Sequence, residues 1–270
     1  MTSLSFQLHS AGVVAPGLTS LADLQLVARG MQPYSAAPLV LPALAQLPSA
    51  ERRRASQAVR LTLACVAQAL EASPFDSAQL RSVFATDEGT GEVCQQMLQA
   101  LATTGQLSPM LFTNSVHNAP SGYFSIAWRN QQPATVVSLG LESFACGLLC
   151  AVTDAMASRQ PVLLAVCDPA MTAPMDELLP IAHGTAAAFV ITAGDAAGPA
   201  ASLGCWRMTL QPPTGAPPSP LPGWLPAEWS RNSSARALAA LCLLEEETDK
   251  VVRFSVGGQV LALWREGRGS

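Results

Sequence analysis

The sequence predicts an α/β fold with a mainly parallel, five-stranded sheet, helices on both faces of the sheet, and a short helix and β-hairpin at the carboxyl end. Three observations support this fold class. Short β-branched and apolar runs alternate with segments of helical period, the order that produces parallel strands joined by helices. Apolar residues make up 49% of the 270 residues, enough for a sizeable core. Near the carboxyl end, Gly257 and Gly258 separate two strand-like runs.

The amino-terminal part of the chain contains one predicted strand and two predicted helices. In order, these segments are a strand with a closing Pro-Gly turn over 4–17, a helix over 21–30, a proline-punctuated loop over 33–48 and a helix over 51–71. In the last segment, apolar residues recur every three or four positions, which is typical of an amphipathic helix. We expect Pro74 to end that helix.

The middle of the chain supplies the other strands of the predicted sheet. Its segments are a strand over 82–86, a glycine-rich turn over 88–91, a helix over 93–101, a loop over 109–120, a helix over 121–129, a strand over 135–138, a helix over 142–158 and strands over 162–166 and 186–192. The turn over 88–91 lacks the Lys-Ser/Thr ending of a phosphate-binding loop. We expect 135–138 to be a central strand.

Proline density marks the predicted domain boundaries. The sequence predicts one domain over 1–195, followed by a proline-rich arm or linker over 196–230, because closely spaced prolines exclude both regular helix and central strand. The remaining residues, 231–270, hold a helix over 234–247 and the hairpin. We expect this last segment to pack on the first domain and to add edge strands.

Charge and cysteine content exclude several classes of function. The formal net charge of −4 gives no basic footprint for nucleic acid. Three adjacent arginines, Arg52 to Arg54, indicate a solvated helix end or, alternatively, a surface for an acidic carrier protein. Seven cysteines without a C-x-x-C pair predict reduced thiols, a cytoplasmic location and no metal site. Asp154 and Arg159 interrupt the most apolar segment, so we expect no membrane span, and the amino terminus lacks the pattern of a secretory signal.

Residues 118–166 carry the most specific motif. Asn118, Ala119 and Gly122 form an N-x-x-A/S-G-like loop, and Pro133 precedes the apolar run over 135–138. The residues after that run form a sharp strand-to-helix turn, and Leu141 lies on it. At the first turn of a helix, unpaired N–H groups and the helix dipole would lower the pKa of a thiol. A leucine at this place cannot act as a nucleophile.

This stretch resembles the amino-terminal half of the β-ketoacyl synthases of the thiolase superfamily, without a gap, and the likeness extends over about 4–195. In that family the position of Leu141 holds the nucleophilic cysteine, and two histidines come from a second half of the fold. The run 115–123 and the helix start at 143–149 resemble the short ketosynthase-like chain-length factors of aryl polyene and related pigment pathways. The resemblance therefore implies a thiolase-like half-fold without catalytic residues or cofactors.

The resemblance also implies a role in a heterodimer. A chain-length factor pairs with an active ketosynthase, shapes the acyl tunnel of that partner, and meets an acyl carrier protein through the complex. Seven residues are candidates for the acyl tunnel or the dimer interface: Gln95, Met97, His117, Asn118, Tyr123, Phe124 and Phe144. For each aromatic side chain among them, packing in the core is the alternative role.

Two other functions remain open from the sequence. The chain could be an acyltransferase or hydrolase that uses Cys146 with His117, although Cys146 lies inside the predicted helix, where the dipole field is weak. It could also be a homodimeric protein that binds acyl chains or acyl carriers. The other histidines suggest no catalytic site, because His183 is expected in a turn and His9 in the first strand.

Overall fold

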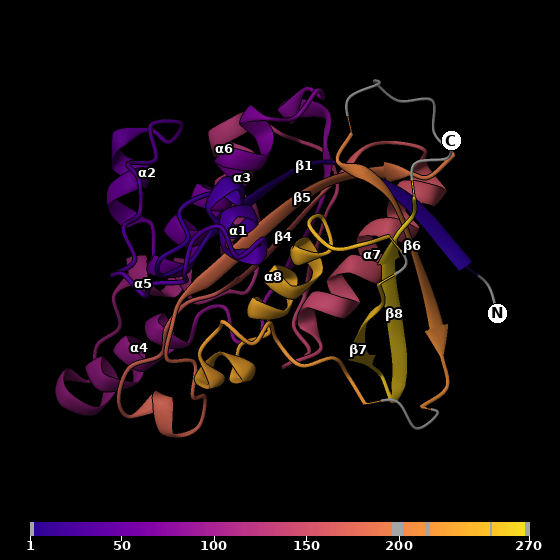
Figure 1. Ribbon diagram of the computed structural model, residues 1–270. Coiled ribbons are helices and arrows are strands. Elements are labelled where there is room, and N and C mark those ends of the chain that lie inside the picture. The colour runs from indigo at the N-terminus through magenta and orange to yellow at the C-terminus, as the bar shows by residue number, and fades with distance from the viewer. Residues whose placement is uncertain (1–2, 196–201, 214–216, 249, 268–270) are drawn as a thin grey trace.

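One mixed sheet organises the computed structural model, which describes residues 3–195, 202–213, 217–248 and 250–267 (Figure 1). In this part of the chain the sheet has eight strands in the order β3-β2-β4-β5-β1-β6-β8-β7. The strands are β1 Ser3–Val14, β2 Arg81–Ala85, β3 Ala134–Val137, β4 Val162–Asp168, β5 Thr185–Ala193, β6 Gly204–Gln211, β7 Val252–Val256 and β8 Gln259–Arg265.

The sheet is less parallel than the sequence predicts. Only β2 with β3 and β2 with β4 pair in parallel, whereas β5 is antiparallel to both of its neighbours, β4 and β1. The reason is the connection between β4 and β5, which contains only the short 3-10 helix Met175–Glu177. A parallel neighbour requires a long crossover, usually a helix, so the chain returns antiparallel here. The prediction that 135–138 forms a central strand is also wrong, because the corresponding strand, β3, lies at the edge of the sheet.

The predicted proline-rich arm over 196–230 is in part a strand of the sheet. Residues 204–211 form β6 between β1 and β8, and the dense prolines begin only after β6. Within the predicted arm, 196–201 and 214–216 lie outside the described residues. Ser219 fastens the later part of the segment to β7: its N–H donates to the Arg253 carbonyl (2.8 Å), and its Oγ accepts from the Arg253 N–H (3.0 Å).

The carboxyl-terminal hairpin is confirmed, with β7 at the edge of the sheet and β8 beside it. The helices of the described residues are α1 Leu21–Ala28, α2 Ser49–Arg54, α3 Gln57–Glu71, α4 Gly91–Thr104, α5 Pro109–Asn114, α6 Ala119–Trp128, α7 Ser143–Ser158 and α8 Ala235–Cys242. The single helix predicted over 51–71 is two helices, because Ser56 caps α3 by accepting from the Val59 N–H. In addition, α5 lies within the predicted loop 109–120, and α8 is shorter than predicted.

Helices cover both faces of the sheet and create two apolar cores. One core holds side chains of α1, α7 and α8, and the other holds side chains of α3 and α6. Successive residues of β4 alternate between the cores: Leu164 belongs to the first, and Leu163 and Ala165 to the second. Figure 1 shows α4 and α5 at one end of the molecule and the hairpin β7–β8 at the other.

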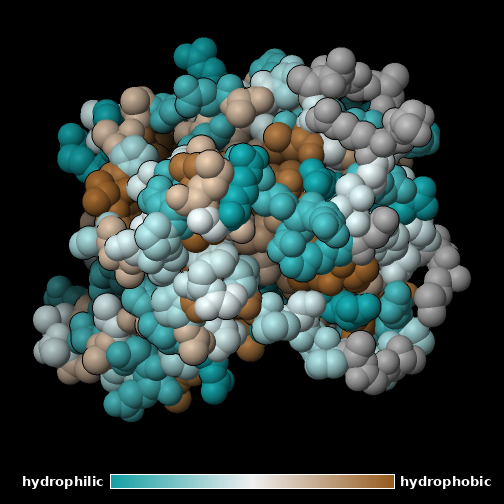
Figure 2. Space-filling model, in the orientation of Figure 1, coloured by the Kyte–Doolittle hydropathy of each residue, from teal (hydrophilic) through white to brown (hydrophobic). Residues whose placement is uncertain are grey.

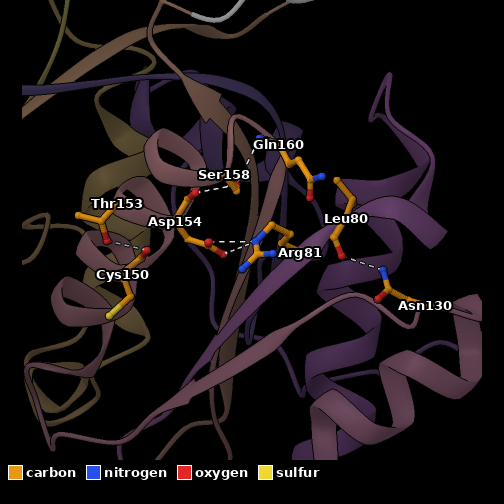
Figure 3. Close-up of polar contacts among 8 residues, drawn as sticks. All are labelled: Leu80, Arg81, Asn130, Cys150, Thr153, Asp154, Ser158 and Gln160. Atoms are coloured by element: carbon orange, nitrogen blue, oxygen red, sulfur yellow. Dashed lines mark hydrogen bonds and ion pairs between the residues drawn. The ribbon is translucent and has the colours of Figure 1, made fainter.

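The segment Gly140–Ser158, which contains α7, is the one helix of the described residues that is long and apolar enough to span a membrane by length and composition alone. Its contacts are those of a core helix, since α7 packs on β2, β4 and β5. Asp154 of α7 accepts two hydrogen bonds of 2.9 Å from Arg81 Nε at the start of β2 (Figure 3). Beside this ion pair, Asn130 Nδ2 donates to the Leu80 carbonyl and ties the end of α6 to β2.

Candidate functional site

The sharp turn between β3 and α7, which we call the elbow (residues 138–142), lies where the sequence predicts it. Gly140 has a φ of 60°, a left-handed conformation that glycine adopts without steric cost. Leu139 and Leu141 flank it and form an isolated β-bridge with each other. Their side chains point outward, and Leu141 is 37% exposed. The elbow therefore presents two aliphatic side chains at the start of the core helix.

Hydrogen bonds inside the elbow fix its shape. Ser143 Oγ accepts from the Leu139 N–H at 2.8 Å and donates to the Gly140 carbonyl at 2.7 Å. The N–H of Ser143 also reaches the Gly140 carbonyl, at 3.0 Å. Ser143 is fully buried, so water does not compete for these bonds.

Three segments distant in sequence fasten the elbow from outside. Ser138 Oγ donates to the Asp87 carbonyl after β2 at 2.9 Å. The Phe144 N–H donates to Ser233 Oγ at 3.0 Å, and the Gly257 N–H of the hairpin turn donates to Glu142 Oε2 at 2.7 Å. The carboxyl-terminal segment is thus part of the candidate site, which the sequence does not predict.

A buried carboxylate, Asp168, organises the surroundings of the elbow. It lies at the end of β4, and its Oδ1 accepts from the Asp87 N–H (2.6 Å) and from Thr86 Oγ1 (3.2 Å). Its Oδ2 accepts from the Ser234 N–H at 2.7 Å, and the Ser234 hydroxyl in turn bonds to the Thr185 carbonyl. Burial raises the pKa of Asp168 to about 6, although the backbone N–H donors oppose this rise.

Two of the predicted tunnel or interface residues, Phe124 and Phe144, are core residues of the single chain, and their tunnel role stays a prediction. Phe124 is 1% exposed and packs between Phe84 and Trp128, with ring centroids 5.8 and 5.4 Å away. Phe144 is fully buried against Phe189 and Phe254. The second turn of α6 and the first turn of α7 point these rings into the two cores, so in the single chain neither ring is exposed.

Gln95 and Met97 lie on α4 and take no part in the hydrogen bonds of the elbow described above. Gln95 is buried, donates to the Ala173 carbonyl and accepts from Thr172 Oγ1, so it fastens α4 to the loop between β4 and β5. Gln95 therefore has a structural role in the single chain, and its place beside the tunnel or interface stays a prediction. Met97 is half-buried.

The other candidates lie in the loop between α5 and α6 and on α6 itself. His117 and Asn118 are exposed, whereas Tyr123 is half-buried. His117 lies near Glu88, where its effect opposes the rise that burial causes in the pKa of Glu88. The hollow that His117 lines together with Gly89 has a volume of only about 10 Å³, which is the space of one water molecule. Such a hollow cannot hold an acyl chain.

The remaining histidines and the cysteines of α7 have ordinary structural surroundings. His9 Nε2 lies 3.0 Å from Thr192 Oγ1, and His183 packs on Trp229 in the loop before β5. Burial and, for Cys146, the Glu142 carboxylate raise the pKa values of Cys146 and Cys150. The Cys146 N–H is already bonded to the Glu142 carbonyl at 2.9 Å. In the described residues no group of three His, Cys, Asp or Glu side chains could hold a metal ion.

The chain belongs to the β-ketoacyl synthase family: the model of the β-ketoacyl synthase N-terminal domain matches residues 27–214. The likeness suggested by the sequence is thereby confirmed, and the fold is of the thiolase-like ketosynthase type. No curated protein matches the sequence.

Solved structures with the same fold include complexes of two synthase-like subunits. One is a ketosynthase (ApeO) in complex with its chain length factor (ApeC) from Xenorhabdus doucetiae, with 22% identity and a TM-score of 0.73, covering 97% of this chain and 100% of that chain. The ishigamide ketosynthase/chain length factor has 12% identity and a TM-score of 0.74, with 97% and 99% covered. AntDE:AntF, a type II ketosynthase complex with its acyl-carrier protein, has 13% identity and a TM-score of 0.74, with 98% and 100% covered.

Proposed function

We propose that this chain is a non-catalytic chain-length-factor subunit, which pairs with an active β-ketoacyl synthase and shapes the acyl tunnel of that partner in polyketide-type biosynthesis. The observation that carries the proposal is Leu141 on the elbow, where a condensing enzyme needs a thiolate. The nearest cysteine along α7, Cys146, has a raised pKa, which is the opposite of the activation that a nucleophile requires.

The two edges of the sheet support a heterodimeric arrangement. At β7 the Ser219 segment covers the edge by hydrogen bonds, whereas β3 at the other end pairs only with β2 in the described chain. Residues 134 and 135 of β3 are exposed. An open edge strand is a template for pairing with another chain, and soluble proteins usually cover such an edge. A synthase partner at β3 would cover it.

Most of the large apolar side chains that are exposed lie in the middle of the chain. Of the fourteen large apolar residues that are exposed in the described chain, ten lie between 98 and 156: Leu98, Leu101, Leu107, Met110, Phe112, Val116, Ile126, Leu139, Leu141 and Met156. By contrast, the face drawn in Figure 2 shows apolar patches separated by polar residues. Leu139, Leu141 and Met156 lie on the elbow and on α7, which contacts β3, so a partner chain at this edge would cover exposed apolar side chains.

Charges support contact with an acidic carrier protein through the same complex. Among the described residues, four of the ten arginines outside α2 meet a carboxylate, and Arg52 and Arg53 of α2 meet none. Arg54 is exposed beside them and bonds to Glu51. A small unpaired basic surface on an acidic chain favours an anionic partner. We also propose a cytoplasmic location, because the seven cysteines are free thiols.

Leu139→Glu is expected to weaken the pairing with the synthase at least about tenfold, because a carboxylate at a desolvated interface costs several kcal/mol. The measurement is co-purification from cells that express both chains, followed by titration of the purified subunits. Met31→Glu is the matched control, since Met31 is 70% exposed but follows α1, which packs beside α8. Equal pairing of both variants would contradict the proposed interface.

The same purified subunits also distinguish two other functions. A cysteine-dependent acyltransferase or hydrolase would show one fast-alkylating thiol, Cys146, in the isolated chain, with His117 needed for the reaction. A homodimeric protein that binds acyl chains or acyl carriers would form dimers of this chain alone and would not bind the synthase. The raised pKa of Cys146 disfavours the cysteine-dependent enzyme, and the binding of the synthase by the purified chain separates the heterodimer from the homodimer.

A further inference from the structure

A surface hollow between the loop 41–44 and the helices α2 and α3 is lined with positive charge. Its volume is about 530 Å³, which is within the range of small-molecule sites. We call it the arginine hollow, and its larger lining residues are Leu41, Pro42, Leu44, Arg52, Arg53 and Arg60. Every charged residue that the structure places in this lining is an arginine, so the hollow is suited to an anion.

The break between α2 and α3 brings these arginines together. Arg52 and Arg53 lie in the last turn of α2, and Ser56 caps the start of α3. Arg60 lies in the first turn of α3 and reaches back across the break: its Nε donates to the Ala55 carbonyl at 3.0 Å, and its Nη2 donates to the Arg52 carbonyl at 3.5 Å. The guanidinium of Arg60 is therefore held in place before a ligand binds.

The charge of these side chains is not neutralised by carboxylates of the described chain. Both acceptors of Arg60 are backbone carbonyls, and the ion pairs of the described residues include none of Arg52, Arg53 and Arg60. Glu51 of α2 pairs with Arg54 instead. A guanidinium has five N–H donors, so Arg60 keeps three of them for a ligand. Because guanidinium groups match the oxygen atoms of phosphate, phosphate is the anion that fits best.

A second hollow adjoins the arginine hollow and carries less charge. Its volume is about 400 Å³, and Leu41 and Arg60 line both hollows. Apolar side chains of α4 and α5 form part of its wall: Val93, Met110 and Leu111. Its other two charged lining residues, Arg54 and Glu92, are of opposite sign, so it offers no net attraction to a second anion. The second hollow therefore suits the organic part of a ligand whose charge lies at one end.

We propose that the arginine hollow binds the phosphate group of a small organic phosphate ester, with the apolar part of the ester lying along Leu41 toward the second hollow. Three positive charges attract the phosphate, and the free Nη donors of Arg60 bind its oxygen atoms. The site goes beyond the proposed function, because neither the synthase nor an acyl tunnel takes part in it.

The test is isothermal titration calorimetry of the full chain at low salt and about pH 7.5, where a phosphate monoester is largely a dianion. The three probes are hexyl phosphate, inorganic phosphate and 1-hexanol. Hexyl phosphate should bind at least about fivefold more tightly than inorganic phosphate, because burial of the alkyl chain adds to the interaction of the charges. The alcohol should not bind measurably. Equal affinities of the two phosphates would indicate an adventitious ion only and would overturn the inference, as would a failure of hexyl phosphate to bind.

Substitutions locate the site. Arg60→Gln should weaken the binding of hexyl phosphate at least about tenfold, because it removes both the charge and the fixed donors. Arg53→Gln should weaken it about three- to tenfold, and Arg53 is exposed, so this variant should fold even if Arg60→Gln does not. Arg231→Gln is the matched control, since Arg231 is exposed at the end of the 3-10 helix Ala227–Arg231 and lines neither hollow. Unchanged affinity in both Arg53→Gln and Arg60→Gln would refute the site.

These measurements separate the inference from the proposed function, because they use the isolated chain. An acyl carrier protein that binds the chain through Arg52 and Arg53, without any binding of hexyl phosphate, would support the carrier contact and overturn the small-molecule site. Conversely, binding of hexyl phosphate by a chain that does not pair with a synthase would support this inference and count against the proposed function.

Discussion

Phe124→Ala is expected to lower the free energy of unfolding by about 3 to 5 kcal/mol, the usual cost of truncating a buried aromatic ring. The ring is 1% exposed and packs against Phe84 and Trp128, so its loss leaves a cavity between α6 and β2. The measurement is urea unfolding followed by tryptophan fluorescence, with the midpoint and slope compared to those of the unchanged chain.

Phe112→Ala is the matched control for this prediction. Phe112 is 61% exposed on α5, so its truncation should change the free energy of unfolding by no more than about 0.5 kcal/mol. In the reconstituted pair the order of effects should reverse if the partner covers the exposed face of α5, because Phe112 would then be buried at the interface. A Phe124→Ala chain that is as stable as the unchanged chain and lengthens the acyl product would contradict a purely structural role of this ring.

Asp168→Asn is expected to abolish a loss of stability that the unchanged chain shows between about pH 4 and pH 6. Burial raises the pKa of Asp168 to about 6, whereas in the unfolded chain the group titrates near 3.9. In this window the folded chain therefore binds more protons, and its free energy of unfolding falls as the pH rises through the folded pKa. The size of the effect is about 3 kcal/mol.

The measurement is a series of denaturant titrations from pH 3.5 to pH 7.5 on both proteins. The difference between the unchanged chain and Asp168→Asn is the informative quantity, because the other carboxyl groups contribute nearly equally to both and cancel. The unchanged chain should lose stability relative to the variant up to about pH 6 and then level off. A constant difference, or one that grows in favour of the unchanged chain as the pH rises, would contradict the assignment.

The elbow is the part of the candidate site whose backbone the sequence predicts well. The β-branched run before residue 138, the glycine at 140 and the apolar helix after it predict strand, turn and helix, and the structure agrees within one or two residues. Register and spacing are local properties, so a strand-to-helix turn can be located from one sequence. The same spacing places Leu141 on the turn, where the structure has it.

The contacts around the elbow could not be predicted in this way. Ser233 bonds to a residue 89 positions away, and the Ser234 N–H bonds to Asp168 across 66 positions. The sequence around these serine and aspartate residues has no pattern that distinguishes a buried hydrogen-bond network from a solvent-exposed loop. Only the fold of the carboxyl-terminal segment back onto the sheet brings them together.

The position of β3 at the edge of the sheet differs from the prediction, although its residues are typical of a buried strand. Thr135, Val136 and Val137 are β-branched residues typical of a buried strand, and the sequence accordingly predicts a central position. In the single chain the strand lies at an open edge. The pattern of a buried strand at an open edge agrees with the proposal that a partner chain completes the sheet.

The most direct test of the central claim is condensation by the co-purified pair of this chain and its synthase, with thiols replaced one subunit at a time. Our account predicts that Cys146→Ala with Cys150→Ala in this chain leaves the condensation rate unchanged, whereas replacing the nucleophilic cysteine of the synthase abolishes it. Loss of condensation when only the cysteines of this chain are replaced would contradict the account.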